Sequence, residues 1–167
     1  SHVSVVPNHQ LNRKTPLHTR ANVAYFGTFG YELDLNKLSD EEISEVKQQI
    51  TFMKEYRELI QFGTFYRLKS PFEGNETAWM IVSEDKKTAL VFWYRERNVV
   101  NADFTRVRLQ GLDPDLIYRN EYNETENYGD ELMNLGLLTT DCTAGEPTSE
   151  DEPCTDYESR IYVLTAK

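Results

Sequence analysis

The sequence predicts a mainly β fold, with an antiparallel β-sandwich over residues 64–167 and the end of an α/β domain over residues 1–62. Three observations support this prediction. A nearly continuous apolar run, Ala21–Phe29, precedes a single long amphipathic segment, Asp40–Phe62. After Gly63 the spacing of apolar residues changes from the period of a helix to the period of a strand. Short strand-like runs separated by turn signals then continue to the end of the sequence.

The first part of the sequence predicts a loop followed by a buried strand. Residues 1–20 are polar and contain Pro7 and Pro16, which favours irregular structure. The run ANVAYFGTF, Ala21–Phe29, is apolar and is interrupted by Gly27. Such runs are typical of a strand that is buried on both faces and needs a layer above and below it. We therefore expect this strand to pack against neighbours from a larger protein.

A helix is predicted from Asp40 to Phe62, and its start is well marked. Ser39 is the expected N-cap, and Glu42, three residues later, completes a capping box. Acidic residues in the first turn also stabilise the helix, because their negative charges lie at the positive end of the helix dipole. Apolar residues at spacings of three and four form one stripe, namely Ile43, Val46, Ile50, Met53, Tyr56 and Ile60. Gly63 is expected to end the helix, so residues 21–62 predict one strand–helix unit.

The remainder predicts the strands of the sandwich. The expected strands are Thr64–Leu68, Thr77–Ser83, Thr88–Arg97, one through Val107 and Leu109, one through Ile117 and Arg119, a candidate edge at Gly129–Thr139, and Ser159–Lys167. An acidic loop rich in threonine and proline, from about Thr139 to Asp156, precedes the last strand. Regularly spaced short strands of this kind indicate an antiparallel sandwich.

Charge and hydropathy exclude several classes of partner. The net charge of −10 argues against binding to nucleic acid or to an anionic membrane surface. No segment approaches the roughly 18 apolar residues of a membrane span. No export signal is visible, and we expect a cytoplasmic protein.

Glu32 and Asp34, in YELDL, are the first candidates for chemistry. Residues two apart in a strand share a face, with Cα atoms about 6.5–7 Å apart, which is within the range of glycosidase carboxylate pairs. Two acids on one strand project in parallel, however, whereas such a pair must flank a sugar from opposite sides. We therefore favour a solvated loop rim that leads into the helix.

The other candidate residues carry weaker signals. His2, His9 and His18 have no metal-binding spacing, which argues against a zinc site, although His2 or His9 at the rim of a pocket stays open. Cys142 and Cys154 lie in the acidic loop, where free thiols are favoured over a disulfide and the pairing stays open.

Three aromatic residues leave a choice between a binding surface and a core. Trp79, Trp93 and Tyr94 would form a sugar-stacking platform if exposed, but their apolar strands favour core packing. Residue types alone therefore disclose no reaction.

Several stretches, in order along nearly the whole sequence, resemble the C-terminal end of family 36 glycoside hydrolases, the bacterial α-galactosidases of the lactobacillus type. These stretches are SHVSVVPNHQ, TPLHTRANVAYFGTFGYELDL, EEISEVKQQITFMKEYRELIQFGTFYRL, WMIVSEDKKTALV, RLQGLDPDLIYR, GDELMNLGL and SRIYVL. The segment TTDCTAGEPTSEDEPC departs from the family by being longer and more acidic, which affects only a surface loop.

The resemblance implies an architecture and a reaction. In that family an N-terminal β-supersandwich precedes a (β/α)8 barrel, and a small antiparallel β-sandwich follows it. Residues 1–62 would be the end of the catalytic barrel, with its last strand and helix, and residues 64–167 the C-terminal sandwich. The implied reaction is retaining hydrolysis of terminal α-galactosides such as raffinose, stachyose and melibiose, with two Asp residues and no metal or organic cofactor.

The resemblance assigns no catalytic residue in this segment, because both Asp residues of the family lie upstream of the HVSxVPN stretch. We therefore expect the isolated segment to be inactive and structural, with the N-terminal and barrel domains of the same enzyme as its partners and a homo-oligomer as its assembly. A carbohydrate-binding β-sandwich module is the alternative, and it requires Trp79, Trp93 or Tyr94 on an exposed face.

Overall fold

The computed structural model describes residues 1–99, 104–139 and 156–167. It divides into two compact units, Ser1–Phe62 and Gly63–Lys167, and each is described by itself below. The open question of whether Cys142 pairs with Cys154 lies outside the described residues.

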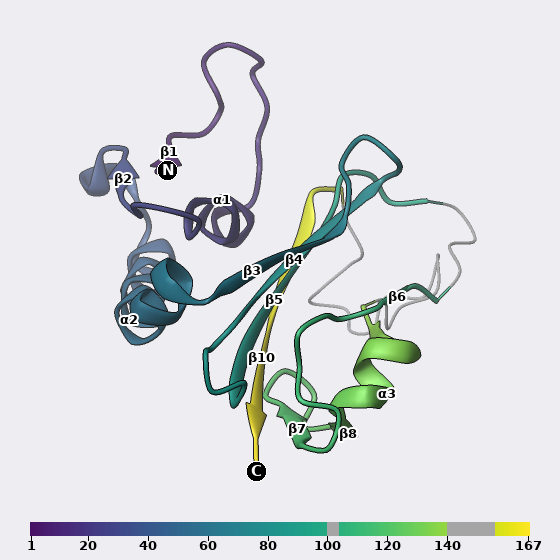
Figure 1. Ribbon diagram of the computed structural model, residues 1–167. Helices are drawn as coiled ribbons and strands as arrows, with labels where there is room; N and C mark the ends of the chain where they lie inside the picture. The colour runs from purple at the N-terminus through teal and green to yellow at the C-terminus, as the bar shows by residue number, and fades with distance from the viewer. Residues whose placement is uncertain (100–103, 140–155) are drawn as a thin grey trace. The chain divides into compact units, whose positions relative to one another are not determined.

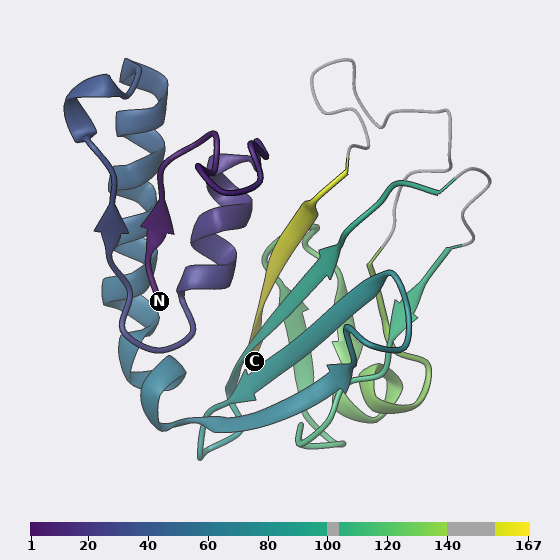
Figure 2. The same ribbon diagram turned by 90° about the horizontal axis from the view of Figure 1, so that it is seen from above.

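The first unit contains two parallel strands and the helices that follow them. Its elements are β1 (Val3–Ser4), α1 (Leu17–Ala24), β2 (Tyr31–Glu32), the short 3-10 helix η1 (Leu35–Lys37) and α2 (Asp40–Phe62). In the parallel pair Val3 lies opposite Tyr31 and Ser4 lies opposite Glu32. Figure 2 shows the two strands side by side, running in the same direction in front of α2. A parallel pair joined through a helix is the βαβ arrangement of α/β folds.

The strand predicted at Ala21–Phe29 is wrong, and so is the loop predicted for residues 1–20. Leu17–Ala24 form α1, with Pro16 at its N-cap, and β1 lies within the first twenty residues. Ala21 and Ala24 are buried whereas Val23 is 50% exposed, so this segment is a helix with one buried side and not a strand buried on both faces. The second strand lies later, at Tyr31–Glu32, and the unit therefore contains two strand–helix units instead of one.

The long helix α2 is confirmed with the predicted bounds, Asp40–Phe62. Its capping box is formed, because the Ser39 backbone N–H donates to Glu42 Oε2 at 2.9 Å and the Glu42 N–H donates to Ser39 Oγ at 3.2 Å. The Phe52 ring packs against those of Tyr25 and Tyr56, with ring centroids 4.9 and 4.8 Å apart. Within the described ranges, neither this helix nor a shorter one combines the length and apolar character that crossing a membrane requires.

The second unit is an antiparallel β structure. Its elements are β3 (Thr64–Lys69), β4 (Glu76–Val82), β5 (Thr88–Arg95), β6 (Arg106–Val107), β7 (Ile117–Asn120), β8 (Glu126–Tyr128), α3 (Gly129–Asn134), β9 (Leu137–Leu138) and β10 (Glu158–Ala166). Six strands form one sheet in the order β3-β4-β5-β10-β7-β8, and β6 pairs with β9 (Figure 1). All of these pairings are antiparallel.

One face of the large sheet packs on a second layer, which makes the unit a sandwich. Alternate residues of the sheet, such as Met80 and Trp93, enter one buried cluster. The opposing layer contributes Leu109, Leu132 and Leu137 from the β6, α3 and β9 segments. Figure 1 shows α3 and β6 on one side of the sheet. The mainly β fold class, with a C-terminal antiparallel sandwich, is therefore confirmed.

The edge strand predicted at Gly129–Thr139 is only partly correct. The segment begins as α3 and ends as β9, which has two residues. Acidic residues in the first turn favour the helix. Gly129 is required there because a Cβ atom on it would lie 1.9 Å from the carbonyl oxygen of Asp113. Gly136, with φ of +91°, turns the chain from helix into strand.

A row of alternating charges crosses four neighbouring strands at one end of the sheet. Lys69 on β3 pairs with Glu76 on β4, which lies opposite Arg95 on β5 in the strand register. Arg95 then pairs with Glu158 on β10, which also accepts from Arg160 Nη2 at 2.7 Å. The Arg95 side chain is only 4% exposed, so this carboxylate is the counter-ion that compensates the buried guanidinium.

Candidate functional site

The carboxyl ends of β1 and β2 define the candidate site. Because the two strands are parallel, both carboxyl ends lie at the same edge, and the loops of residues 5–16 and 33–39 follow them. Binding and catalytic residues of α/β folds lie at this edge of the strands.

The two faces of the strand pair differ in character. Val3 is fully buried, and the Tyr31 hydroxyl donates to Gln49 Oε1 of α2 at 2.8 Å, so both residues mark the face covered by helices. Since side chains alternate along a strand, His2, Ser4 and Glu32 belong to the opposite face. On that face His2 Nε2 lies 2.7 Å from Glu32 Oε2, with the side chains 53% and 75% exposed.

Arg20 of α1 fixes the loop after β1. Its Nε donates to the carbonyl of Thr15 at 3.1 Å, and its Nη1 donates to the carbonyl of Ser4 at 2.5 Å. The guanidinium therefore joins the end of the strand to the end of the loop. Burial lowers the pKa of Arg20, and the charges of Glu42 and Glu45 act in the opposite direction. The sequence reasoning missed this residue.

Asn8 gives the same loop a defined turn. Its Oδ1 accepts from the backbone N–H of Gln10 at 3.0 Å and of Leu11 at 3.1 Å, and its own N–H donates to the carbonyl of Arg13 at 2.9 Å. His9 is exposed within this turn. A side-chain acceptor two or three residues before the N–H groups is the usual way in which asparagine stabilises a turn.

The predicted candidates do not gather into one cluster. Asp34 is not on the strand with Glu32, because β2 ends at Glu32. Instead, Asp34 Oδ1 accepts from the backbone N–H and from Nδ2 of Asn36, each at 3.0 Å, and so caps η1. Both acids are exposed, as expected for a loop rim. His18 lies on α1, and no group of three metal-ligating side chains occurs in the described parts of the chain.

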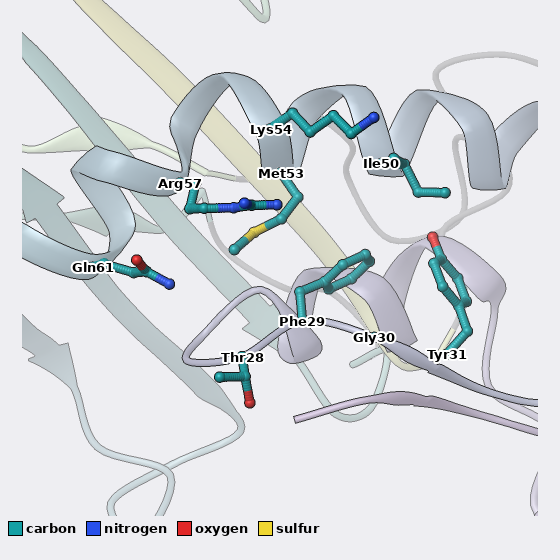
Figure 3. Close-up of a pocket in the computed structure, with 9 residues that line it drawn as sticks. All are labelled: Thr28, Phe29, Gly30, Tyr31, Ile50, Met53, Lys54, Arg57 and Gln61. Carbon is teal, nitrogen blue, oxygen red and sulfur yellow. The ribbon is translucent and has the colours of Figure 1, made fainter.

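A hollow of about 470 Å³ lies at the other end of β2. Its lining is Thr28, Phe29, Gly30, Tyr31, Ile50, Met53, Lys54, Arg57 and Gln61 (Figure 3). Burial raises the pKa of Tyr31 to about 12 and also raises that of Tyr25, with Glu45 adding to both shifts. The lining of the hollow reaches β2 only at Tyr31, the first residue of the strand, so the hollow lies at the amino end of β2, opposite the candidate site.

The three candidate aromatic residues of the sandwich, Trp79, Trp93 and Tyr94, do not form an open platform. Trp93 is fully buried in the core, which confirms the packing role favoured for it. The Trp79 and Tyr94 side chains are half-buried, and their rings pack against each other with centroids 4.7 Å apart at an interplanar angle of 37°.

Comparisons with known proteins match both units to families of glycosyl hydrolases. Residues 1–63 match the family described as Melibiase, and residues 76–164 match the family described as Glycosyl hydrolase family 36 C-terminal domain. The α-galactosidase AgaA of Geobacillus stearothermophilus is 52% identical over 137 residues, which is 82% of this chain and 19% of the relative. α-Galactosidase 1 of Pediococcus pentosaceus is 45% identical over 166 residues, covering 99% of this chain and 21% of the relative.

Solved structures agree along the whole chain. The α-galactosidase of Lactobacillus brevis matches 100% of this chain with a TM-score of 0.89 and 43% identity, over 22% of its own length. A crystal structure of AgaA in complex with 1-deoxygalactonojirimycin matches 100% of this chain with the same TM-score and 44% identity, also over 22% of its length. The chain spans about a fifth of the length of the relatives that it matches. It belongs to glycosyl hydrolase family 36 and contains the C-terminal domain of that family.

Proposed function

We propose that this chain is the C-terminal part of an α-galactosidase that hydrolyses terminal α-galactosides of the raffinose and stachyose type. Residues 1–62 form the end of the catalytic barrel, and residues 64–167 form the C-terminal sandwich. The observation that carries the proposal is the end-to-end match of this chain to α-galactosidase structures, with a TM-score of 0.89 over 100% of its length. Crystal structures of AgaA variants hold stachyose and raffinose, which supports this substrate class.

The proposed reaction proceeds with retention through two carboxyl groups, one as nucleophile and one as acid and base. We assign neither group to this chain. Its proposed contribution is the wall of the active site at the carboxyl ends of β1 and β2, where Arg20 and Asn8 hold the loop after β1. The family resemblance implies no metal ion or organic cofactor for this chemistry.

The alternative, a carbohydrate-binding module, has less support. Such a module needs exposed aromatic faces, whereas Trp93 is in the core and Trp79 packs on Tyr94. The cytoplasmic location and the homo-oligomeric assembly stay predictions. Native mass spectrometry of an active enzyme that contains this chain tests the assembly.

A chimera tests the proposed function directly. The C-terminal fifth of Geobacillus AgaA that matches this chain is replaced by residues 1–167, and turnover of raffinose and of a nitrophenyl α-galactoside is measured. We expect the chimera to be active and the isolated chain to be inactive. AgaA truncated at the same point is the control for activity that needs no C-terminal part. A folded chimera with no more activity than the truncated enzyme would contradict the proposal.

A further inference from the structure

We propose that Glu32, oriented by His2, is a sugar-facing residue that accepts hydrogen bonds from hydroxyl groups of the bound galactoside. The inference rests on the proposed function and adds a residue of this chain to the substrate site. Glu32 is assigned a binding role, distinct from the two carboxyl groups that carry the reaction.

The direction of the side chain follows from the covered and uncovered faces of the strands. Val3 and Tyr31 occupy the face toward the helices, so His2, Ser4 and Glu32 occupy the other face. In a (β/α)8 barrel the helices form the outer ring and the remaining face of each strand points into the barrel. The His2–Glu32 pair therefore faces the interior of the proposed barrel.

Glu32 lies at the carboxyl end of β2, which is the end of the strands that would form the active site of the proposed barrel. Glu32 is the last residue of β2 and lies opposite Ser4, the last residue of β1. Active-site residues of such barrels come from the carboxyl ends of the strands. Arg20 holds the Ser4 carbonyl, which fixes the neighbouring strand end and the start of its loop.

The chemistry of the pair is unusual for a barrel interior and suits a sugar. Branched apolar side chains dominate the packed layers of these barrels, whereas this face carries an imidazole and a carboxylate 2.7 Å apart. A carboxylate offers about four acceptor positions over its two oxygens. His2 occupies one of them at Oε2, and the remaining positions suit the hydroxyl donors of a neutral galactoside.

The two residues have different roles in this arrangement. Glu32 supplies the acceptor oxygens. His2, which directly precedes the neighbouring strand β1, is a positioning residue because its contact restricts rotation of the carboxylate. Loss of Glu32 should therefore weaken substrate binding more than loss of His2.

The test compares variants of the AgaA chimera described above. Glu32→Ala should lower kcat/KM by about tenfold or more, mostly through KM, because a hydrogen bond to a charged group is lost. Glu32→Gln keeps the size and one acceptor oxygen and should lose less, and His2→Ala should lose about threefold. Glu58→Gln is the matched control, since Glu58 is an exposed carboxylate near the far end of α2, and it should stay within about twofold of the parent.

A binding measurement separates this inference from the proposed function. Calorimetric affinity for 1-deoxygalactonojirimycin should fall in the Glu32 variants in parallel with the rise in KM, at an unchanged melting temperature. Unchanged KM and unchanged affinity in Glu32→Ala would overturn the inference, as would a loss of kcat that only follows a lower melting temperature. An unsubstituted chimera without turnover would count against the proposed function, whereas the affinity measurement would still report on Glu32.

Discussion

The two units of this chain bury their apolar residues in different ways. Unit Gly63–Lys167 encloses its own core, in which Trp93 and Tyr162 from the sheet meet residues of the opposing layer. Unit Ser1–Phe62 covers one face of two short strands with helices and leaves the His2–Glu32 pair exposed on the other face. The comparison teaches that the second unit has a closed core of its own, whereas the first leaves one face of its strand pair uncovered.

The largest expected effect tests whether the second unit depends on its own core. Trp93→Ala removes a fully buried ring and should lower the free energy of unfolding of this unit by about 3–5 kcal/mol. Phe72→Ala is the control, because Phe72 is 95% exposed and its loss should change the stability little. Denaturant unfolding followed by circular dichroism measures both variants, and equal effects would contradict the assignment of the core.

A second prediction concerns the row of charges that closes the end of the sheet. Glu158→Gln leaves the buried guanidinium of Arg95 without its carboxylate and should destabilise the second unit by about 3 kcal/mol. Glu124→Gln provides the comparison, since the Arg119–Glu124 pair is exposed at 3.0 Å and should contribute less than about 1 kcal/mol. Chemical denaturation at constant pH measures the free energy of unfolding of both variants. A Glu158→Gln effect as small as the Glu124→Gln effect would show that the row of charges does not stabilise the sheet.

The smallest expected effect belongs to the first unit. Ser39→Ala removes the side-chain acceptor of the Glu42 N–H and should destabilise α2 by about 1 kcal/mol. Ser44→Ala, an exposed position inside the same helix, should be neutral or slightly stabilising, because alanine has the higher helix propensity. Thermal unfolding monitored at 222 nm compares them. If Ser39→Ala proved as harmless as Ser44→Ala, the capping box would have no energetic role.

The elements predicted correctly from the sequence are those with strong local signals. Helix α2 was expected at its observed bounds because a capping box, a regular apolar stripe and a terminal glycine all agree. Strands β4, β5 and β10 were expected because each is a run of seven to nine residues rich in apolar, β-branched and aromatic side chains. Trp93 was expected in the core for the same reason.

The elements that were missed depend on contacts beyond their own sequence. Strands β1 and β2 have two residues each, so no periodic pattern could identify them, and their parallel pairing joins residues far apart in the chain. The run Ala21–Phe29 is apolar enough for a strand, but its short side chains also allow the helix that ends at Ala24. The candidate site was therefore predicted only as a set of separate residues, and neither the His2–Glu32 pair nor the Arg20 contacts followed from spacing.

The position of β10 has a consequence for how this protein is made. The last strand of the chain, Glu158–Ala166, lies in the interior of the six-stranded sheet, hydrogen-bonded to β5 on one side and to β7 on the other. Because β10 follows every other strand of this sheet in the sequence, the two halves of the sheet cannot join until β10 has left the ribosome. A nascent chain stalled before Glu158 would present two unpaired strand edges, which makes it a target for chaperones and proteases.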